Sequence, residues 1–226
     1  MRLLEEPNAE ITTLISYGSA QANSLYSLSA LAKIKGWKLE FYVDHLPEWL
    51  KDKPIGNYRG ALDLGAHVIS VSDMDSNLHP RDYIAQVREP DSDCLVLPEG
   101  GRSPLAEYGV KQLAHEILSW SRFENNHQFV VALPSGTGST ALYLNKYLKP
   151  HNIEVLTCAC VGGEDYLKLQ FEELGEPEHP TILSLNSKHH FGKLYKQDYQ
   201  TWLDLHFETD VEFDLLYDPM MWQCLD

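Results

Sequence analysis

Basic residues are scarce in this sequence. It contains 18 lysines and arginines against 33 aspartates and glutamates, which gives a formal net charge of −15. A nucleic-acid partner requires a basic stripe that neutralises its phosphates, and no such stripe is visible here. The composition therefore excludes nucleic acid as a partner. It stays compatible with a small anion held by the backbone amides of a single turn.

Cysteines are few, and long apolar runs are absent. The cysteines at 94, 158, 160 and 224 lack zinc-like spacing. Cys158 and Cys160 fall in an apolar run, where strand alternation turns both side chains to one face, so we expect buried thiols rather than a metal site. No apolar run approaches the length of a membrane span, and no secretory signal opens the chain. We therefore expect no membrane partner and a cytoplasmic location.

Apolar patterning divides the chain of 226 residues into alternating strands and helices. The predicted strands are residues 11–17, 37–43, 66–71, 94–97, 129–133, 154–161, 181–185 and 213–217, and the predicted helices are 22–35, 57–64, 80–88, 105–120, 141–148, 163–173 and 197–207. Most of the strands are apolar throughout, which is typical of parallel strands covered by helices on both faces. The sequence predicts an α/β fold with mostly parallel sheets.

A turn of small residues, 135–140 (Ser-Gly-Thr-Gly-Ser-Thr), joins the predicted strand at 129–133 to the predicted helix at 141–148. Such a turn exposes backbone N–H groups at the positive end of the helix dipole, where a phosphate is the usual occupant. The alternative is an ordinary strand–helix turn with a serine or threonine cap. The turn alone does not decide between the two.

Three stretches in the same order along the chain resemble segments of one enzyme family. Residues 18–24 (Gly-Ser-Ala-Gln-Ala-Asn-Ser) look like a Gly-Gly-x-Gln-Ser-Asn-His loop, residues 97–101 (Leu-Pro-Glu-Gly-Gly) like a Pro-x-Gly-Gly segment, and residues 137–140 like a phosphate cup. A fourth, residues 213–217 (Phe-Asp-Leu-Leu-Tyr), resembles an Asp-Pro-x-Tyr segment on a late strand. Together they resemble the pyridoxal-phosphate enzymes of the aminocyclopropane-carboxylate deaminase and D-cysteine desulfhydrase family.

This resemblance implies the tryptophan-synthase-β-like fold, with two interleaved lobes. The chain would form one unit over residues 1–226, in which a smaller lobe around residues 15–100 is inserted in a larger lobe. The implied cofactor is pyridoxal 5′-phosphate, and the implied partners are a small amino-acid substrate and a second copy of the chain in a homodimer.

The resemblance also assigns site residues. The phosphate would be held by the backbone amides and hydroxyls of Gly136, Thr137, Gly138, Ser139 and Thr140.

Three more residues would surround the ring and the substrate. Asn23 would face the phenolic oxygen of the cofactor ring, Gln21 would line the substrate-carboxylate side of the same loop, and Tyr217 would be the catalytic tyrosine near the substrate. Each has a simpler alternative. Asn23 can cap a helix, Gln21 can be an exposed loop residue, and Tyr217 can pack with its hydroxyl at the surface.

The sequence departs from the family at several of these positions. Ala22 replaces a loop serine that can act as nucleophile or proton relay, Ser24 replaces a histidine, and Phe191 replaces a second active-site tyrosine. Ring opening of aminocyclopropane carboxylate relies on those groups in the family, so the resemblance does not carry that substrate over to this chain.

The Schiff-base lysine of the family has no counterpart in this sequence. In the family it lies in a Gly-Asn-Lys segment before the first glycine-rich loop, whereas this sequence starts at Met1-Arg2-Leu3-Leu4 and its first lysine is Lys33. We expect Lys33, Lys35 and Lys193 to be surface charges. We therefore expect a truncated or lysine-less relative, which would still bind the cofactor but lack the main base for proton transfer.

Three functions remain. The first is a pyridoxal-phosphate-dependent lyase or deaminase of a small amino acid, inactive if the lysine is missing. The second is a non-catalytic protein that binds pyridoxal phosphate or an amino acid. The third is a nucleotide-binding α/β domain, but no Gly-x-Gly-x-x-Gly follows the first predicted strand and no Gly-Lys-Ser/Thr ends the turn.

Overall fold

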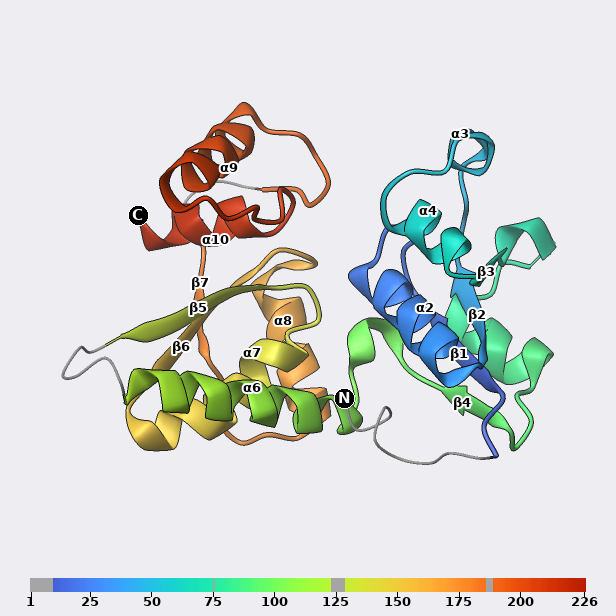
Figure 1. Cartoon of the computed structure of the whole chain (residues 1–226), viewed down its shortest axis with the longest axis horizontal. Helices are drawn as coiled ribbons and strands as arrows, with labels where there is room; N and C mark the ends of the chain where they lie inside the picture. Colours follow the sequence, from blue (N-terminus) through green and yellow to red (C-terminus); the bar gives the residue numbers. More distant parts are fainter. Residues whose placement is uncertain (1–9, 75, 123–128, 186–188) are drawn as a thin grey trace. The chain divides into compact units, whose positions relative to one another are not determined.

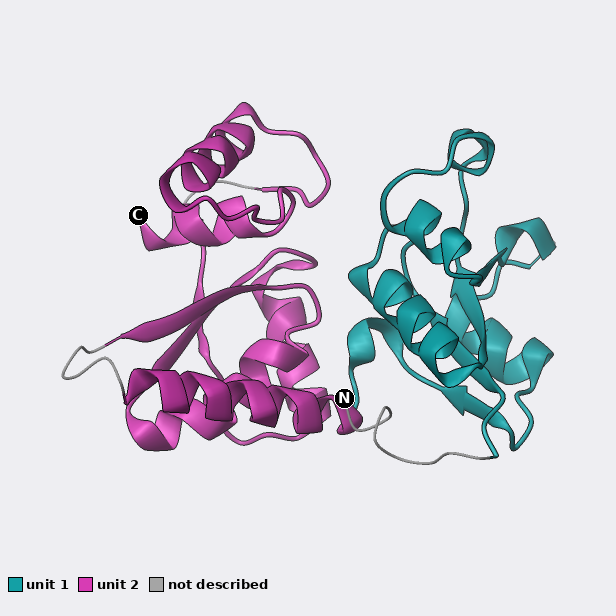
Figure 2. Cartoon of the chain, viewed as in Figure 1, with its two compact units in different colours: residues 1–103 teal, residues 104–226 magenta. Residues whose placement is uncertain are grey.

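The computed structural model describes residues 10–74, 76–122, 129–185 and 189–226 (Figure 1). The chain divides into two compact units between Ser103 and Pro104 (Figure 2). Each unit has its own parallel sheet, as the alternating pattern predicted. Insertion of a smaller lobe around residues 15–100 into a larger one stays a prediction.

Unit 1 contains a four-stranded sheet with the strand order β3-β2-β1-β4. Its strands are β1 (Thr13–Tyr17), β2 (Lys38–Val43), β3 (His67–Ser70) and β4 (Cys94–Val96), all parallel. Its helices are α2 (Asn23–Lys35), α3 (Glu48–Asp52), α4 (Gly56–Asp63) and α5 (Pro80–Tyr83), with a π-helical segment η2 (Ile84–Arg88) and short 3₁₀ turns η1 (Ser72–Met74) and η3 (Glu99–Gly101).

Alternation along β1 explains why both faces of this sheet are covered. Leu14 packs with Leu25 of α2 in one core cluster, and Ile15 packs with Ile84 of η2 in another. Successive residues of a strand point to opposite faces, so the apolar side chains of β1 are removed from water on both faces of the sheet. Their burial stabilises the sheet.

Unit 2 contains a three-stranded parallel sheet with the order β5-β6-β7. Its strands are β5 (Val130–Ser135), β6 (Glu154–Ala159) and β7 (Thr181–Leu183), and its helices are α6 (Leu105–Ser121), α7 (Ser139–Leu148), α8 (Gly163–Leu174), α9 (Lys196–Thr209) and α10 (Asp218–Leu225), with the 3₁₀ turn η4 (Lys149–His151). Among the described residues, every helix is too short or too polar to cross a lipid bilayer.

The thiols of Cys158 in β6 and of Cys160, directly after that strand, are both buried, as predicted. Their sulfur atoms lie 3.8 Å apart, and they share a core cluster with Met220 and Met221 of α10. The neighbouring Cys160 thiol and burial raise the pKa of Cys158. Burial also raises the pKa of Cys224 to about 12. The thiols of Cys158 and Cys224 therefore stay protonated and pack as small apolar groups.

The predicted strand at residues 213–217 is wrong. Asp214 folds this segment into a turn, because its Oδ1 accepts hydrogen bonds from the backbone N–H of Leu216 at 2.8 Å and of Tyr217 at 3.1 Å. Such side-chain bonds to the backbone compete with strand pairing. Pro219 then lies in the first turn of α10, where its ring favours a helix start. The sequence pattern also missed the short helix α3.

Asp214→Ala removes both bonds and should lower the free energy of unfolding by about 1 kcal/mol, the usual loss for such a cap. Urea denaturation followed by circular dichroism measures this change. Glu212→Ala, at a nearby exposed position, is the control and should leave the midpoint unchanged. Equal losses in the two variants would contradict a role of Asp214 in the turn.

Candidate functional site

The turn after β5 is fixed at its base by hydroxyl groups. Ser135 and Thr157 are buried, and their hydroxyl oxygens lie 2.7 Å apart. Thr157 also bonds the Leu133 carbonyl oxygen at 2.8 Å, and the backbone N–H of Cys160 donates to the Ser135 carbonyl oxygen at 2.9 Å. These bonds hold the carboxyl ends of β5 and β6 together, so the turn leaves the sheet in a defined direction.

Gly138 is required by the close packing of this turn. Its φ of 77° is in the left-handed region, and a Cβ built on it would lie 2.5 Å from side-chain atoms of both Leu167 and Phe171. Those two side chains are fully buried in α8. The turn therefore lies directly on the hydrophobic core under α8, and no larger residue fits.

The N-terminus of α7 has the features of an anion site. Its N-cap is Gly138, which offers no side chain to the N–H groups of the first turn. The hydroxyl of Ser139 is buried without a hydrogen-bond partner among the described residues. A serine or threonine cap, the alternative for this turn, is therefore not what the structure shows. A bound phosphate would satisfy both the N–H groups and the hydroxyl.

Of the other predicted cup residues, Gly136 and Thr137 are half-buried and Thr140 is exposed. Tyr217 lies beside Gly136. A Cβ built on Gly136 would be 3.5 Å from the Tyr217 hydroxyl oxygen, and the Tyr217 ring contacts the Phe191 ring with a centroid distance of 4.8 Å. The structure thus brings the predicted catalytic tyrosine to the predicted cup, from a helix N-terminus rather than a strand.

In unit 1, the loop after β1 is tied to the segment before α4. The Gln21 side-chain N–H donates to the Ile55 carbonyl oxygen at 3.1 Å. Asn57 donates to the backbone carbonyl oxygen of Gln21 and to the Asn23 side-chain oxygen, each at 2.9 Å. Asn23 caps nothing, since the N-cap of α2 is Ala22. The bond from Asn57 orients the Asn23 amide and leaves its NH₂ group as a donor.

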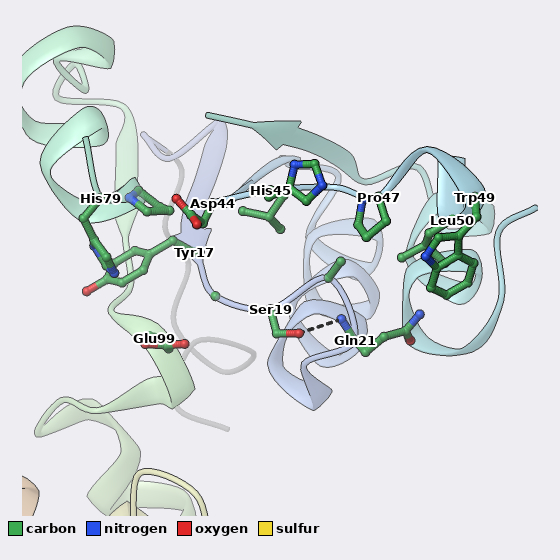
Figure 3. A pocket seen from close by; sticks show the side chains of 14 residues that line it. Tyr17, Ser19, Gln21, Asp44, His45, Pro47, Trp49, Leu50, His79 and Glu99 are labelled. Atoms are coloured by element: carbon green, nitrogen blue, oxygen red, sulfur yellow. Dashed lines mark hydrogen bonds between the residues drawn. The ribbon is translucent and has the colours of Figure 1, made fainter. Parts of the chain in front are cut away.

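A cavity of about 460 Å³ opens at the carboxyl edge of the unit 1 sheet (Figure 3). Gln21 lines it, together with Ser19, whose hydroxyl accepts the Gln21 backbone N–H at 3.2 Å. Asn23 is not among its lining residues. Ligands of α/β proteins commonly bind at this edge of the sheet.

Sequence reasoning missed most of the charged lining of this cavity. Asp44 and His45 follow β2, and His79 precedes α5. Glu99 comes from the Pro-x-Gly-Gly segment, and its Oε1 lies 3.3 Å from a Cβ built on Gly18. Asp44 and His45 directly follow the predicted strand at 37–43, and this position could have identified them as candidate site residues. No sequence pattern pointed to His79. Carboxylates and imidazoles together suit a polar ligand.

The predicted site residues are divided between the units: Gln21 and Asn23 belong to unit 1, and the cup and Tyr217 to unit 2. Lys33 and Lys193 are exposed, as predicted. No lysine is among the described residues around the unit 1 cavity. The start of the sequence, Met1-Arg2-Leu3-Leu4, lies outside the described residues.

No protein-family model and no curated protein matches this chain. Solved structures do match. A crystal structure of an ACC deaminase homologue is 18% identical, with a TM-score of 0.74 over 99% of this chain and 71% of that chain. The chain has the tryptophan-synthase-β-like pyridoxal-phosphate fold.

Two further structures share this fold. A hydrogen sulfide-producing enzyme from Fusobacterium nucleatum is 12% identical, with a TM-score of 0.64 over 98% of this chain and 75% of that chain. A cysteine synthase from Entamoeba histolytica is also 12% identical, with a TM-score of 0.58 over 91% of this chain and 59% of that chain. At these identities the similarity establishes the fold and leaves the activity open.

Alanine substitutions at two glycines distinguish the cost of close packing in the turn from the cost of backbone strain. Gly138→Ala and Gly175→Ala both place an alanine at a left-handed φ, of 77° and 76°, but a Cβ at Gly175 meets no described atom within 4 Å. Gly175→Ala should cost about 1 kcal/mol of unfolding free energy through strain. Gly138→Ala should cost about 3 kcal/mol, because Leu167 and Phe171 must also move. Urea denaturation measures both, and equal losses would mean that the turn tolerates a side chain.

Proposed function

We propose that this chain binds pyridoxal 5′-phosphate and is a lyase or deaminase of a small amino acid, of the aminocyclopropane-carboxylate deaminase or D-cysteine desulfhydrase type. The N-terminus of α7 carries the proposal. It combines uncapped N–H groups with the buried, unpartnered hydroxyl of Ser139, on a fold shared with solved deaminase and cysteine synthase structures. The alternative is a non-catalytic relative that binds the cofactor or an amino acid.

The phosphate would be held by unit 2. The backbone of Gly136, Thr137 and Gly138 would donate N–H groups, and Ser139 and Thr140 would add hydroxyl donors. This arrangement would bind a dianion without a lysine or arginine, because the helix dipole and the amides would supply the positive potential. When bound, the cofactor supplies an electron sink for the carbon at which the substrate reacts.

Other residues would bind the ring and the substrate. The Asn23 NH₂ group, oriented by Asn57, would donate to the phenolic oxygen of the ring. Gln21, in the wall of the unit 1 cavity, would bind the substrate carboxylate. Tyr217 would hold or move a proton at its hydroxyl oxygen, which lies beside Gly136. No described lysine is assigned as the residue that carries the cofactor.

Replacing the hydroxyls of the cup separates a ligand-binding role from a structural one. Ser139→Ala with Thr140→Ala should weaken pyridoxal-phosphate binding about tenfold, the usual loss for hydrogen bonds to a charged group. The unliganded variant should be as stable as the wild type, because the Ser139 hydroxyl has no described partner to lose. Absorbance titration and urea denaturation are the measurements.

Ser119→Ala is the matched control, since this serine of α6 is exposed and its hydroxyl donates to the His115 carbonyl oxygen within its own helix, at 2.8 Å. It should leave cofactor affinity unchanged. Unchanged affinity in the cup variant as well would show that the phosphate binds elsewhere.

Borohydride reduction distinguishes the enzyme from the binding protein. The protein is incubated with pyridoxal phosphate, its visible spectrum is recorded, and borohydride is added. An enzyme should give an adduct on one specific lysine, found by peptide mass spectrometry, and should release ammonia or a keto acid from an amino acid. Reversible binding with no trapped lysine and no such product would leave the non-catalytic alternative.

A further inference from the structure

One carboxylate in α9 connects two other segments of unit 2. Asp198 Oδ2 lies 2.8 Å from His189 Nε2, and the side chains of Asp198 and His189 are only 14% and 10% exposed. Asp198 Oδ1 accepts a hydrogen bond from Gln223 of α10 at 3.1 Å. A carboxylate so little exposed is costly unless its oxygens are bonded, so both partners are held in place.

The first partner belongs to a loop that is closed by its own contacts. The His189 ring stacks on the Tyr195 ring with a centroid distance of 4.6 Å and an interplanar angle of 30°. The His190 backbone N–H donates to the Tyr195 hydroxyl at 3.1 Å. Phe191 lies between these contacting residues, with His189 and His190 before it and Tyr195 after it. The Asp198–His189 bond therefore also restricts the position of the Phe191 backbone.

The second partner belongs to the helix that Tyr217 begins. Tyr217 is the N-cap of α10, and Gln223 lies in the same helix. The Phe191 ring contacts the Tyr217 ring at 4.8 Å, and the Tyr217 hydroxyl lies 3.5 Å from a Cβ built on Gly136. Asp198 is therefore connected to the turn after β5 by two series of contacts. One runs through His189 and the loop to Phe191 and Tyr217, and the other runs through Gln223 and α10 to Tyr217.

We propose that Asp198 is a positioning residue. By holding His189 with one oxygen and Gln223 with the other, it keeps the Phe191 ring in contact with the Tyr217 ring and the Tyr217 hydroxyl beside Gly136. The contact with the cofactor site rests on the proposed function. The arrangement of the two rings does not, and is a property of the unliganded chain.

Nuclear magnetic resonance of the unliganded full chain tests this arrangement. Asp198→Ala should abolish the nuclear Overhauser effect between the Phe191 and Tyr217 rings and shift the backbone amide signal of Gly136. Asp198→Asn keeps one acceptor oxygen and should fall between Asp198→Ala and the wild type. If Asp198→Ala does not fold, Gln223→Leu removes the bond from α10 to Asp198, together with the 3.4 Å bond from Gln223 to the Thr201 hydroxyl, and should also weaken the ring–ring signal; Thr201→Val removes only the second bond and should leave it unchanged.

Asp204→Ala is the matched control. Asp204 lies in the same helix and accepts a hydrogen bond from the Gln200 side chain at 2.8 Å, but on an exposed surface. It should change neither signal. The proposal is overturned if the ring–ring signal and the Gly136 amide are unchanged in Asp198→Ala, or if Asp204→Ala changes them equally.

Pyridoxal-phosphate titration gives the second readout. The dissociation constant should rise about tenfold in Asp198→Ala and stay constant in Asp204→Ala, because only the first removes the bonds proposed to hold Tyr217 beside Gly136. A wild type that binds no pyridoxal phosphate would refute the proposed function, while the ring–ring signal would still decide whether Asp198 positions the two rings.

Discussion

The close packing of Gly138 on the core of unit 2 is the constraint on which the candidate site depends. Because Leu167 and Phe171 of α8 leave no room for a side chain at position 138, the residue directly before α7 must be glycine. That same requirement leaves the first N–H groups of α7 without a cap and buries the Ser139 hydroxyl. Close packing of the hydrophobic core against Gly138 thus leaves polar backbone N–H groups available at the edge of the sheet.

The second half of unit 2 completes this site with aromatic residues. Asp214 turns the chain into α10, and Asp198 bonds the helix and the loop before α9. The Tyr217 ring contacts the Phe191 ring although the two come from separate segments, and the Tyr217 hydroxyl lies beside Gly136. In unit 1, the loop with Gln21 lines a cavity that also contains Asp44 and Glu99, at the carboxyl edge of its own sheet. Both units thus present polar groups where their parallel strands end, as expected for this fold.

The sequence by itself determined the strand–helix alternation and the places where strands end. Apolar spacing such as that of Leu25, Leu28 and Leu31 reflects the local geometry of one helix, so it can be read without tertiary information. The small-residue turn at 135–140 and the loop at 18–24 were found for the same reason. The order of these motifs along the chain also led to the correct fold, although pairwise identities to its solved relatives are below 20%, at 18% and 12%.

Only the tertiary structure decided which residues complete the site. Asn57 orients Asn23, Glu99 lies against Gly18, and the Tyr217 hydroxyl lies beside Gly136, yet each pair is distant in sequence. The strand predicted at 213–217 was wrong because the hydrogen bonds that the Asp214 side chain accepts from the backbone outweigh an apolar pattern. Local sequence encodes backbone periodicity, whereas contacts between segments depend on how the sheets and helices pack, and no local pattern contains that information.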